Sequence, residues 1–338
     1  MPHTYLVTGS TGFIARHIIA GLLQRGHTVV GSARSKAGDA KVRAALAPVL
    51  DDTDWQDRYR TITLDLSSDE GWDDALVGID GVFHTASPFP LEQPRNEADL
   101  IRPAVDGALR ALRSAQKAGV TRVVLTSSSA AITGKPKPGP VMAFDETDWS
   151  DVDDATMTPY AKSKTLAERA AWDFAADHPE MQLTAINPSL VLGAPLGDDF
   201  GTSVGLIERL MDGRDPMLPR VGFASVDVRD VATAHIRAME DPATIGKRYP
   251  LADRFLWFAD LAEAVKRAAP QAKVPTRVAP NVIIRILGLF DRSVSTILPI
   301  LGKEYALSAD AARSDLGIEF RDAFKAAQDT ASWMQKRV

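Results

Sequence analysis

The glycine-containing stretch VTGSTGFIA, residues 7–15, constrains the fold of this chain more than any other feature. The apolar run TYLVTG at 4–9 precedes it and is typical of a buried strand. The helix-like segment 12–26 follows it and ends at a glycine. A glycine turn between a first strand and a first helix lets the backbone approach a diphosphate, and the helix N-terminus offers free N–H groups to it. We therefore expect an α/β fold that binds a dinucleotide at this turn.

The spacing of this turn is G-x-x-G-x-x-A, formed by Gly9, Gly12 and Ala15, and differs from the commoner G-x-G-x-x-G. Alanine at the third position still permits close packing of the helix on the strand. A purely structural glycine turn is the alternative, but its position between the first strand and helix favours cofactor binding. The residues expected to contact the cofactor here are Thr8, Gly9, Thr11, Gly12, Phe13 and Ile14.

Strand-like and helix-like segments alternate through the first half of the chain. Apolar runs at 27–34, 60–66, 81–87, 122–129 and 183–193 are separated by sequence compatible with helices. Strands that are apolar throughout and interleaved with helices predict a doubly wound parallel sheet, the Rossmann-type α/β architecture.

Basic residues follow the second strand, where they bear on the choice of cofactor. An enzyme that uses NAD usually has an acidic residue at this position for the ribose 2′-hydroxyl. Here Arg34 ends the strand, and Lys36 and Lys41 follow closely. Because a guanidinium can bind a 2′-phosphate through charge-assisted hydrogen bonds, we expect NADP(H). Asp65 and Leu66, at the end of the third strand, are placed for the adenine, although an exposed Asp there also serves as a helix cap.

Beyond residue 190 the alternation loosens, and the last part of the chain is mostly helical with proline breaks. We assign residues 1–189 plus 226–249 to the NADP-binding domain. Residues 190–225 plus 250–338 are expected to form a smaller, mostly helical substrate lobe. The apolar stretch 282–290 is interrupted by charge and too short to span a membrane, so it predicts a core-facing or lid helix.

Composition excludes several classes of function. The chain has 338 residues, a net charge of −5 and no basic block, which argues against nucleic-acid binding. The absence of cysteine excludes disulfides, thiolate metal sites and a cysteine nucleophile. The histidines show no ligand spacing, so we expect no metal. The start of the sequence has no secretory pattern, and we expect a cytoplasmic protein without membrane contact.

The segment YAKSK, residues 160–164, places Tyr160 four residues before Lys164. In a helix these positions share a face, and a nearby ammonium favours phenolate and lowers the pKa of a tyrosine. Chance produces this spacing often, so the pair means little alone. A serine cluster, Ser127 to Ser129, follows the fifth strand, at the edge of the sheet where ligands bind.

The glycine turn, Arg34, the serine cluster and Y-x-x-x-K occur in the order of extended short-chain dehydrogenases/reductases. The chain resembles the branch of dihydroflavonol reductases, cinnamoyl-CoA reductases and microbial aldehyde or methylglyoxal reductases over most of its length. The more specific marks of this resemblance are GVFHTASPF (81–89), DETDWSD (145–151), YAKSKTLAERAAWDFA (160–175) and INPSLVLG (186–193).

This resemblance implies a catalytic triad. Tyr160 would be the general acid that protonates the developing alkoxide, and Lys164 would lower its pKa and bind the nicotinamide ribose. Ser128 aligns with the catalytic serine, while Ser127 and Ser129 remain open because the triple serine makes the register ambiguous. The resemblance also implies that cofactor contacts come from Thr85, Ala86, Ser87, Pro188, Ser189, Leu190, Val191 and Ser203.

Three departures from the family pattern limit what carries over. Ala15 replaces the last glycine, LGAP at 192–195 stands where Gly-Pro is usual, and PAVDG at 103–107 replaces the Asn-Val-x-Gly-Thr of many extended members. An asparagine-held water that relays protons is therefore not assumed. His84 adjoins the expected cofactor channel, and a packed core role is expected for it.

We expect an NADPH-dependent carbonyl reductase that converts an aldehyde or ketone reversibly to an alcohol. A nucleotide-sugar epimerase or dehydratase of the same fold, or a non-catalytic NADP sensor, is the alternative. Residues 87–90 and 221–223, with Met142 and Phe200, suggest an apolar pocket wall and hence an apolar or aromatic substrate. The protein is expected to be a monomer or homodimer, as is typical of such relatives.

Overall fold

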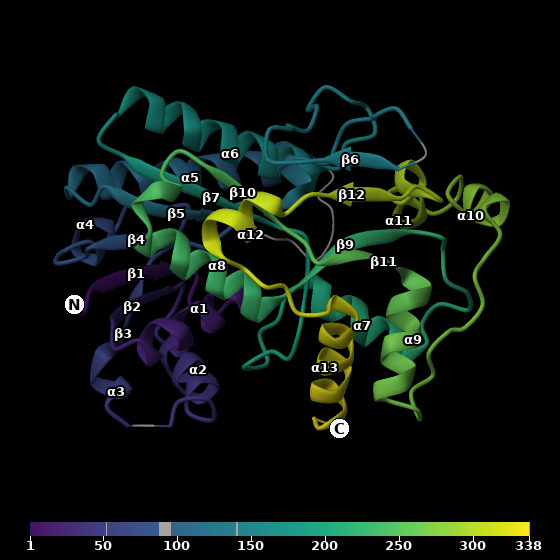
Figure 1. The fold of residues 1–338 in the computed structure, drawn as a ribbon, viewed down its shortest axis with the longest axis horizontal. Helices are drawn as coiled ribbons and strands as arrows, with labels where there is room; N and C mark the ends of the chain where they lie inside the picture. The colour runs from purple at the N-terminus through teal and green to yellow at the C-terminus, as the bar shows by residue number, and fades with distance from the viewer. Residues whose placement is uncertain (52, 88–95, 140, 338) are drawn as a thin grey trace.

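The centre of the molecule is a seven-stranded, wholly parallel sheet (Figure 1). The computed structural model describes residues 1–51, 53–87, 96–139 and 141–337. The strand order β10-β7-β5-β4-β1-β2-β3 reverses direction between β1 and β4, so the expected doubly wound sheet is confirmed. The strands are β1 (Thr4–Thr8), β2 (Thr28–Ala33), β3 (Tyr59–Thr63), β4 (Gly81–His84), β5 (Arg122–Thr126), β7 (Gln182–Pro188) and β10 (Arg248–Leu251).

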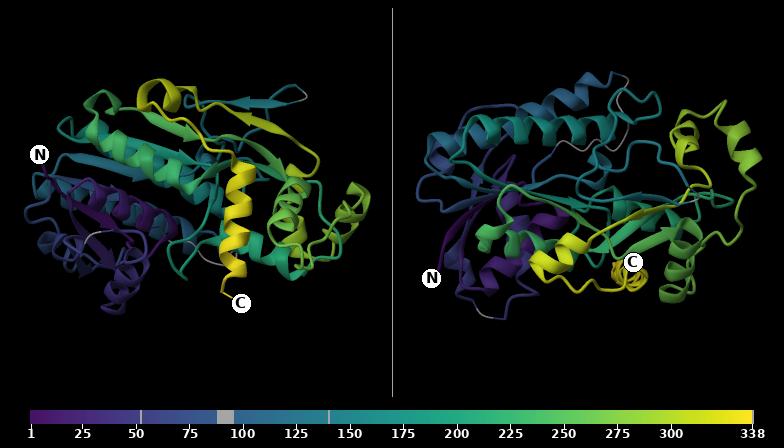
Figure 2. Two further views of the ribbon diagram at one scale, coloured as in Figure 1. Left: turned by 60° about the horizontal axis from the view of Figure 1, so that its bottom comes forward. Right: turned by 45° about the horizontal axis from the view of Figure 1, so that its top comes forward.

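Helices cover both faces of this sheet. Successive side chains of each strand point to opposite faces, so each face has its own buried core. Leu6 packs in the core beneath α5 (Ala98–Lys117) and α6 (Pro159–Asp177). Val7 packs in the other core, beneath α1 (Phe13–Gln24) and α8 (Val228–Glu240) (Figure 2). Three shorter helices complete this half of the chain: α2 (Ala37–Leu46), α3 (Trp55–Arg58) and α4 (Trp72–Ala75).

A second, three-stranded sheet lies beside the main one, with the order β11-β9-β8. β8 (Leu190–Leu192) runs parallel to β9 (Gly222–Asp227), and β11 (Arg254–Trp257) pairs with β9 in the antiparallel sense. The helices of this region are α7 (Thr202–Asp212), α9 (Phe258–Ala268), α10 (Asn281–Leu287), α11 (Arg292–Ser295), α12 (Asp310–Leu316) and α13 (Ala323–Gln335).

A two-stranded parallel pair joins distant parts of the sequence. β6 (Met142–Phe144) lies beside β12 (Tyr305–Leu307), so the chain near its C-terminal end returns to a segment from its first half (Figure 1). Phe144 and Leu307 are buried together in a small apolar cluster.

The last part of the chain is mostly helical, as expected, and also holds the short strands β11 and β12. Two expectations about elements need correction. The run 183–193 is two strands, because β7 joins the main sheet and β8 joins the smaller one. The core-facing interpretation of 282–290 is wrong for most of its side chains, since Ile284 is the buried residue of α10. Its exposed apolar neighbours are Val282, Ile283, Ile286, Leu287, Leu289 and Phe290.

Residues 226–249 divide between the two sheets. α8 packs against α1, and β10 extends the main sheet next to β7. Asp227, at the end of β9, belongs to the smaller sheet and caps α8 by accepting a hydrogen bond from the Arg229 N–H. Among the described residues, no helix is both long enough and apolar enough to cross a membrane.

Candidate active site

A cleft of about 1360 Å³ opens at the carboxyl ends of the central strands, where the strand order reverses. In open α/β sheets this is the place where ligands bind. Arg34 and Lys41 line one end of the cleft, and Phe223 and Tyr305 line the other. Its volume exceeds the ~300–1,000 Å³ of an ordinary small-molecule pocket, so it has room for a dinucleotide with a substrate beside it.

The glycine turn is shaped for close approach. Gly9 has φ +66°, and a Cβ there would lie 3.0 Å from the Cα of Ala86, so a side chain at this position would be strained and crowded. Gly12 precedes α1, and no side chain caps this helix N-terminus. Its free N–H groups and the helix dipole therefore face the cleft at Phe13 and Ile14.

The cleft brings together most of the residues that the sequence singled out. Seventeen of them line it, from both the cofactor set and the catalytic set: Gly9, Thr11, Gly12, Phe13, Ile14, Arg34, Lys41, Thr85, Ser87, Ser128, Tyr160, Lys164, Pro188, Ser189, Leu190, Val191 and Ser203.

Five predicted cofactor residues lie outside this lining. Thr8 is buried, and its hydroxyl accepts hydrogen bonds from the N–H groups of Thr85 and Ala86 at 3.1 and 3.0 Å, which ties β1 to the end of β4. Ala86 packs against the glycine turn. The other three are Lys36, Asp65 and Leu66.

Asp65 makes a local turn. Its Oδ1 accepts hydrogen bonds from the Ser67 N–H at 2.7 Å and from the Ser67 hydroxyl at 2.5 Å. These hydrogen bonds lower the pKa of Asp65, and the nearby positive charge of Arg34 adds to the effect. Leu66 packs against Gly107 of α5. Asp65 therefore stabilises a turn and does not cap α4, since that helix begins at Trp72 with Gly71 as its N-cap residue.

Arg34 and Lys41, the lining residues predicted to bind the 2′-phosphate, differ in their surroundings. Arg34 is exposed at the end of β2 and forms no salt bridge within the described ranges. Lys41 pairs with Asp199 at 2.9 Å, and the same carboxylate lies 3.6 Å from the buried Arg16. Asp199 was missed from the sequence, since an acidic residue in a glycine-rich loop is ordinarily solvated. A phosphate at Lys41 would have to share that ammonium with Asp199.

Tyr160 and Lys164 lie on the first turns of α6. Thr158 caps the helix by accepting a hydrogen bond from the Ala161 N–H at 3.2 Å, and Pro159 occupies the first helical position. The Lys164 ammonium lies 5.9 Å from the centroid of the Tyr160 ring. The shared helix face that the i, i+4 spacing predicts is therefore present.

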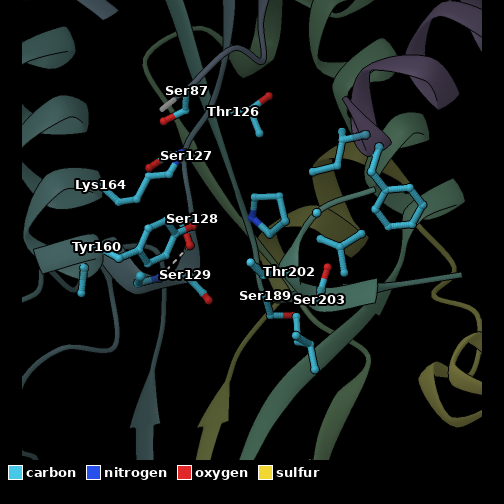
Figure 3. A pocket seen from close by; sticks show the side chains of 18 of the residues that line it. Ser87, Thr126, Ser127, Ser128, Ser129, Tyr160, Lys164, Ser189, Thr202 and Ser203 are labelled. Carbon is cyan, nitrogen blue, oxygen red and sulfur yellow. Dashed lines mark hydrogen bonds between the residues drawn. The ribbon is translucent and has the colours of Figure 1, made fainter. Parts of the chain in front are cut away.

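The three serines after β5 lie near Tyr160 and Lys164 (Figure 3). Ser127 donates its hydroxyl to Glu168 at 2.5 Å. Ser128 accepts from the Ala130 N–H at 3.1 Å and forms a hydrogen bond with Tyr160. Ser128 is thus the serine whose hydroxyl meets the phenol, and this contact favours it over Ser127.

Burial sets the pKa values of the pair. Burial raises the pKa of Tyr160, and the hydrogen bond with Ser128 opposes this. The expected lowering of the tyrosine pKa by Lys164 is wrong for this structure, because the cost of burying a phenolate dominates. Burial lowers the pKa of Lys164 to about 8, and the charge of Glu168 opposes the decrease.

His84 is a core residue, as expected. It is 4% exposed, and its Nδ1 lies 3.0 Å from the Thr8 hydroxyl. Burial lowers its pKa to about 4, so it is neutral at physiological pH. Among the described residues, no group of three or more His, Asp or Glu side chains is arranged to hold a metal ion.

The end of the cleft lined by Phe223 and Tyr305 holds many apolar side chains. Met142, Phe200 and Phe223, which the sequence suggested as a pocket wall, all line the cleft, but Phe200 follows Asp199 and so lies at the end that holds Lys41. Residues 88–90 lie outside the described residues. Sequence reasoning missed the rest of this wall, because its residues carry no motif and come from distant segments. These residues include Met157, Ile297, Pro299, Ile300 and Tyr305, with Lys135, Asp154 and Lys303.

Comparison with known families agrees with this geometry. Residues 5–252 match the model of the NAD dependent epimerase/dehydratase family, which is more than half of the chain. The chain belongs to this family. Within it, the chain is an extended short-chain dehydrogenase/reductase and is homologous to plant and yeast reductases.

Two plant relatives and one solved structure illustrate the relationship. Cinnamoyl-CoA reductase CAD2 of Medicago truncatula is 35% identical over 81% of this chain and 83% of the relative. Cinnamoyl-CoA reductase 1 of Arabidopsis thaliana is 32% identical over 99% of this chain and 90% of the relative. The yeast methylglyoxal/isovaleraldehyde reductase Gre2, solved in complex with NADPH, is 30% identical, covers 99% of this chain and 98% of its own, and has a TM-score of 0.81.

Proposed function

We propose that this protein is an NADPH-dependent carbonyl reductase that converts an aldehyde or ketone to an alcohol. The observation that carries the proposal is the hydrogen-bonded pair of Ser128 and Tyr160 on the wall of a cleft whose other end holds Arg34. Relatives over nearly the whole chain bear the names of reductases, and Gre2 was solved with NADPH.

The residues of the cleft fit a dinucleotide. The N-terminus of α1 and the turn at Gly9 suit a diphosphate, and Arg34 is free to bind a 2′-phosphate. The buried Ser189 hydroxyl lines the cleft and has no hydrogen-bond partner among the described residues, which leaves a polar group for the nicotinamide end. We assign residues 1–189 plus 226–249 to NADPH binding and 190–225 plus 250–338 to substrate binding.

The proposed mechanism divides the work among three side chains. The bound cofactor supplies the hydride. Ser128 hydrogen-bonds the substrate carbonyl oxygen, and Tyr160, neutral because burial raises its pKa, donates its proton to that oxygen as charge develops there. Lys164 binds the nicotinamide ribose and stabilises the phenolate that remains.

The apolar wall favours an apolar or aromatic substrate. Met142 and Phe223 offer contact to a hydrocarbon or ring, as do Ile297 and Ile300, although Lys135, Asp154 and Lys303 also line the cleft. We therefore expect higher kcat/KM for aryl or branched carbonyls than for small polar dicarbonyls, and the reverse order would reject this substrate class. We propose a cytoplasmic monomer or homodimer that uses neither nucleic acid nor a membrane.

The deciding experiment is the oxidation of NADPH by the purified protein with aliphatic aldehydes, aryl ketones and diketones. We expect turnover with NADPH, and Tyr160→Phe should lower kcat by about 10²–10⁴-fold, the usual contribution of a general acid. Tyr5→Phe is the matched control, because Tyr5 is a buried tyrosine of the core. Folded protein that binds NADPH but reduces no carbonyl would reject the proposal.

The alternatives make different predictions. A nucleotide-sugar dehydratase places acidic residues after the fifth-strand hydroxyl, whereas Ser129, Ala130 and Ala131 form a short 3₁₀ helix here. Purified protein carrying tightly bound NAD would favour that alternative. A non-catalytic NADP sensor would bind NADPH without turnover, and the presence of both Tyr160 and Lys164 argues against it.

A further inference from the structure

A second, small cavity adjoins the cleft beside Lys164. Its volume is about 20 Å³, which is room for about one water molecule. The helix α5 contributes only Ala104 and Ala108 to its lining. The polar residues that line the cavity are Ser87, Thr126, Ser127 and Lys164, which also line the cleft, with His84 and Glu168.

Glu168 is a buried carboxylate with a full set of donors. Its side chain has no exposed area. Oε1 accepts from Arg248 Nε at 2.6 Å and from Trp172 Nε1 at 3.2 Å. Oε2 accepts from the Ser127 hydroxyl at 2.5 Å and from Asn187 Nδ2 at 2.7 Å. Because each carboxylate oxygen accepts two hydrogen bonds, the carboxylate is held in one orientation.

Arg248 connects this carboxylate to the loop before α6. Its guanidinium donates to the backbone oxygens of Glu146 and Asp148 and stacks on the Trp149 ring at 3.7 Å from the centroid. The loop before α6 therefore fixes Glu168 through Arg248, and Ser127 of the serine cluster fixes it from the other side.

Glu168 follows Lys164 by one helical turn on α6, so the two side chains share a face. Within the described residues they form no ion pair at 4.0 Å or less, and both line the small cavity. The negative charge of Glu168 nevertheless raises the pKa of Lys164 against the effect of burial. A molecule that fills the cavity could link the two side chains through hydrogen bonds.

We propose that the small cavity holds one ordered water that accepts a hydrogen bond from the Lys164 ammonium and donates one to the Ser127 hydroxyl oxygen, whose own proton is donated to Glu168. Glu168 is then a positioning residue: it keeps Lys164 charged and oriented while Tyr160 delivers its proton. This inference rests on the proposed reductase function.

The sign of the expected pH effect follows from the charges around Lys164. Loss of the Glu168 charge removes the influence that raises the Lys164 pKa, so this pKa falls further. The lysine then becomes neutral at lower pH, and the alkaline limb of the activity profile moves to lower pH. The charged or titratable groups near Lys164 are Tyr160 and Glu168 on α6 and His84 on β4, with Arg248 on β10 facing Glu168.

The test is the pH dependence of kcat/KM for NADPH-driven reduction in the wild type and in Glu168→Gln. We expect the alkaline limb to shift down by about one pH unit, with kcat falling more than the Kd for NADPH rises. Coincident alkaline limbs would overturn the proposal. Wild-type protein without any turnover would instead reject the reductase function.

Two further variants guard against a purely structural effect. Trp172→Phe removes one donor to Glu168 on the side of Oε1 and should leave the alkaline limb unchanged, although it lowers the melting temperature. If Glu168→Gln does not fold, Ser127→Ala decides, because it removes a partner of the water without changing any charge and should shift the limb in the same direction. A high-resolution crystal structure with no water between Lys164 and Ser127 would also reject the bridge, with or without activity.

Discussion

Arg34 is a single exposed side chain that bears on which cofactor the protein uses. It ends β2, lines the cleft and forms no salt bridge within the described ranges, whereas Lys41 is already paired with Asp199 at 2.9 Å. The guanidinium is therefore the better candidate to receive a 2′-phosphate.

We predict that Arg34→Glu raises the KM for NADPH by about 10–100-fold, because a hydrogen bond to a charged group contributes about 1.5–3 kcal/mol. The KM for NADH should change little, so the preference moves toward NADH. Steady-state kinetics with both cofactors would check this. Lys36→Glu makes the same change of charge outside the cleft lining and should have a smaller effect; equal effects of the two would show that only net charge matters.

The helix α6 carries Tyr160, Lys164 and Glu168 on one face, so its N-terminus determines how the Tyr160 phenol is oriented. Thr158 caps this terminus. We predict that Thr158→Ala lowers the free energy of unfolding by about 1 kcal/mol, through loss of the hydrogen bond from the Ala161 N–H. Urea denaturation would measure this loss. Thr158→Ser keeps the hydroxyl and should retain most of the stability, and a similar loss in both variants would contradict the capping role.

Elements with a strong periodic or motif signal could be predicted from the sequence. The strands β1, β2, β4 and β5, the glycine turn and α6 fall where expected, because each combines a hydrophobic pattern with a local signal. The break at Ser189 could not be predicted, since the apolar run continues on both sides while the chain passes from one sheet to the other. The apolar wall around Tyr305 was also missed, because no local pattern tells which distant segment closes a cleft.

At the scale of the whole molecule, the two walls of the cleft differ in the secondary structure that supports them. The wall with the glycine turn and Arg34 is built on the seven-stranded sheet, which has a core on each face. The wall with Met142 and Tyr305 depends in part on the pair of β6 and β12, three residues each, and on residues 296–305 leading into it. A two-stranded pair is marginal without further packing, so this wall is expected to open at a lower free energy than the sheet.

The return of β12 to β6 thus has a thermal consequence. We predict a range of temperatures in which the protein still binds NADPH but reduces its carbonyl substrate poorly, because substrate alignment is lost first. Hydrogen exchange would show the amides of Tyr305–Leu307 exchanging well before those of Leu6 and Val7, and equal protection would contradict this. In that range the protein would act as a reservoir for the cofactor, and cooling would restore catalysis without refolding of the sheet.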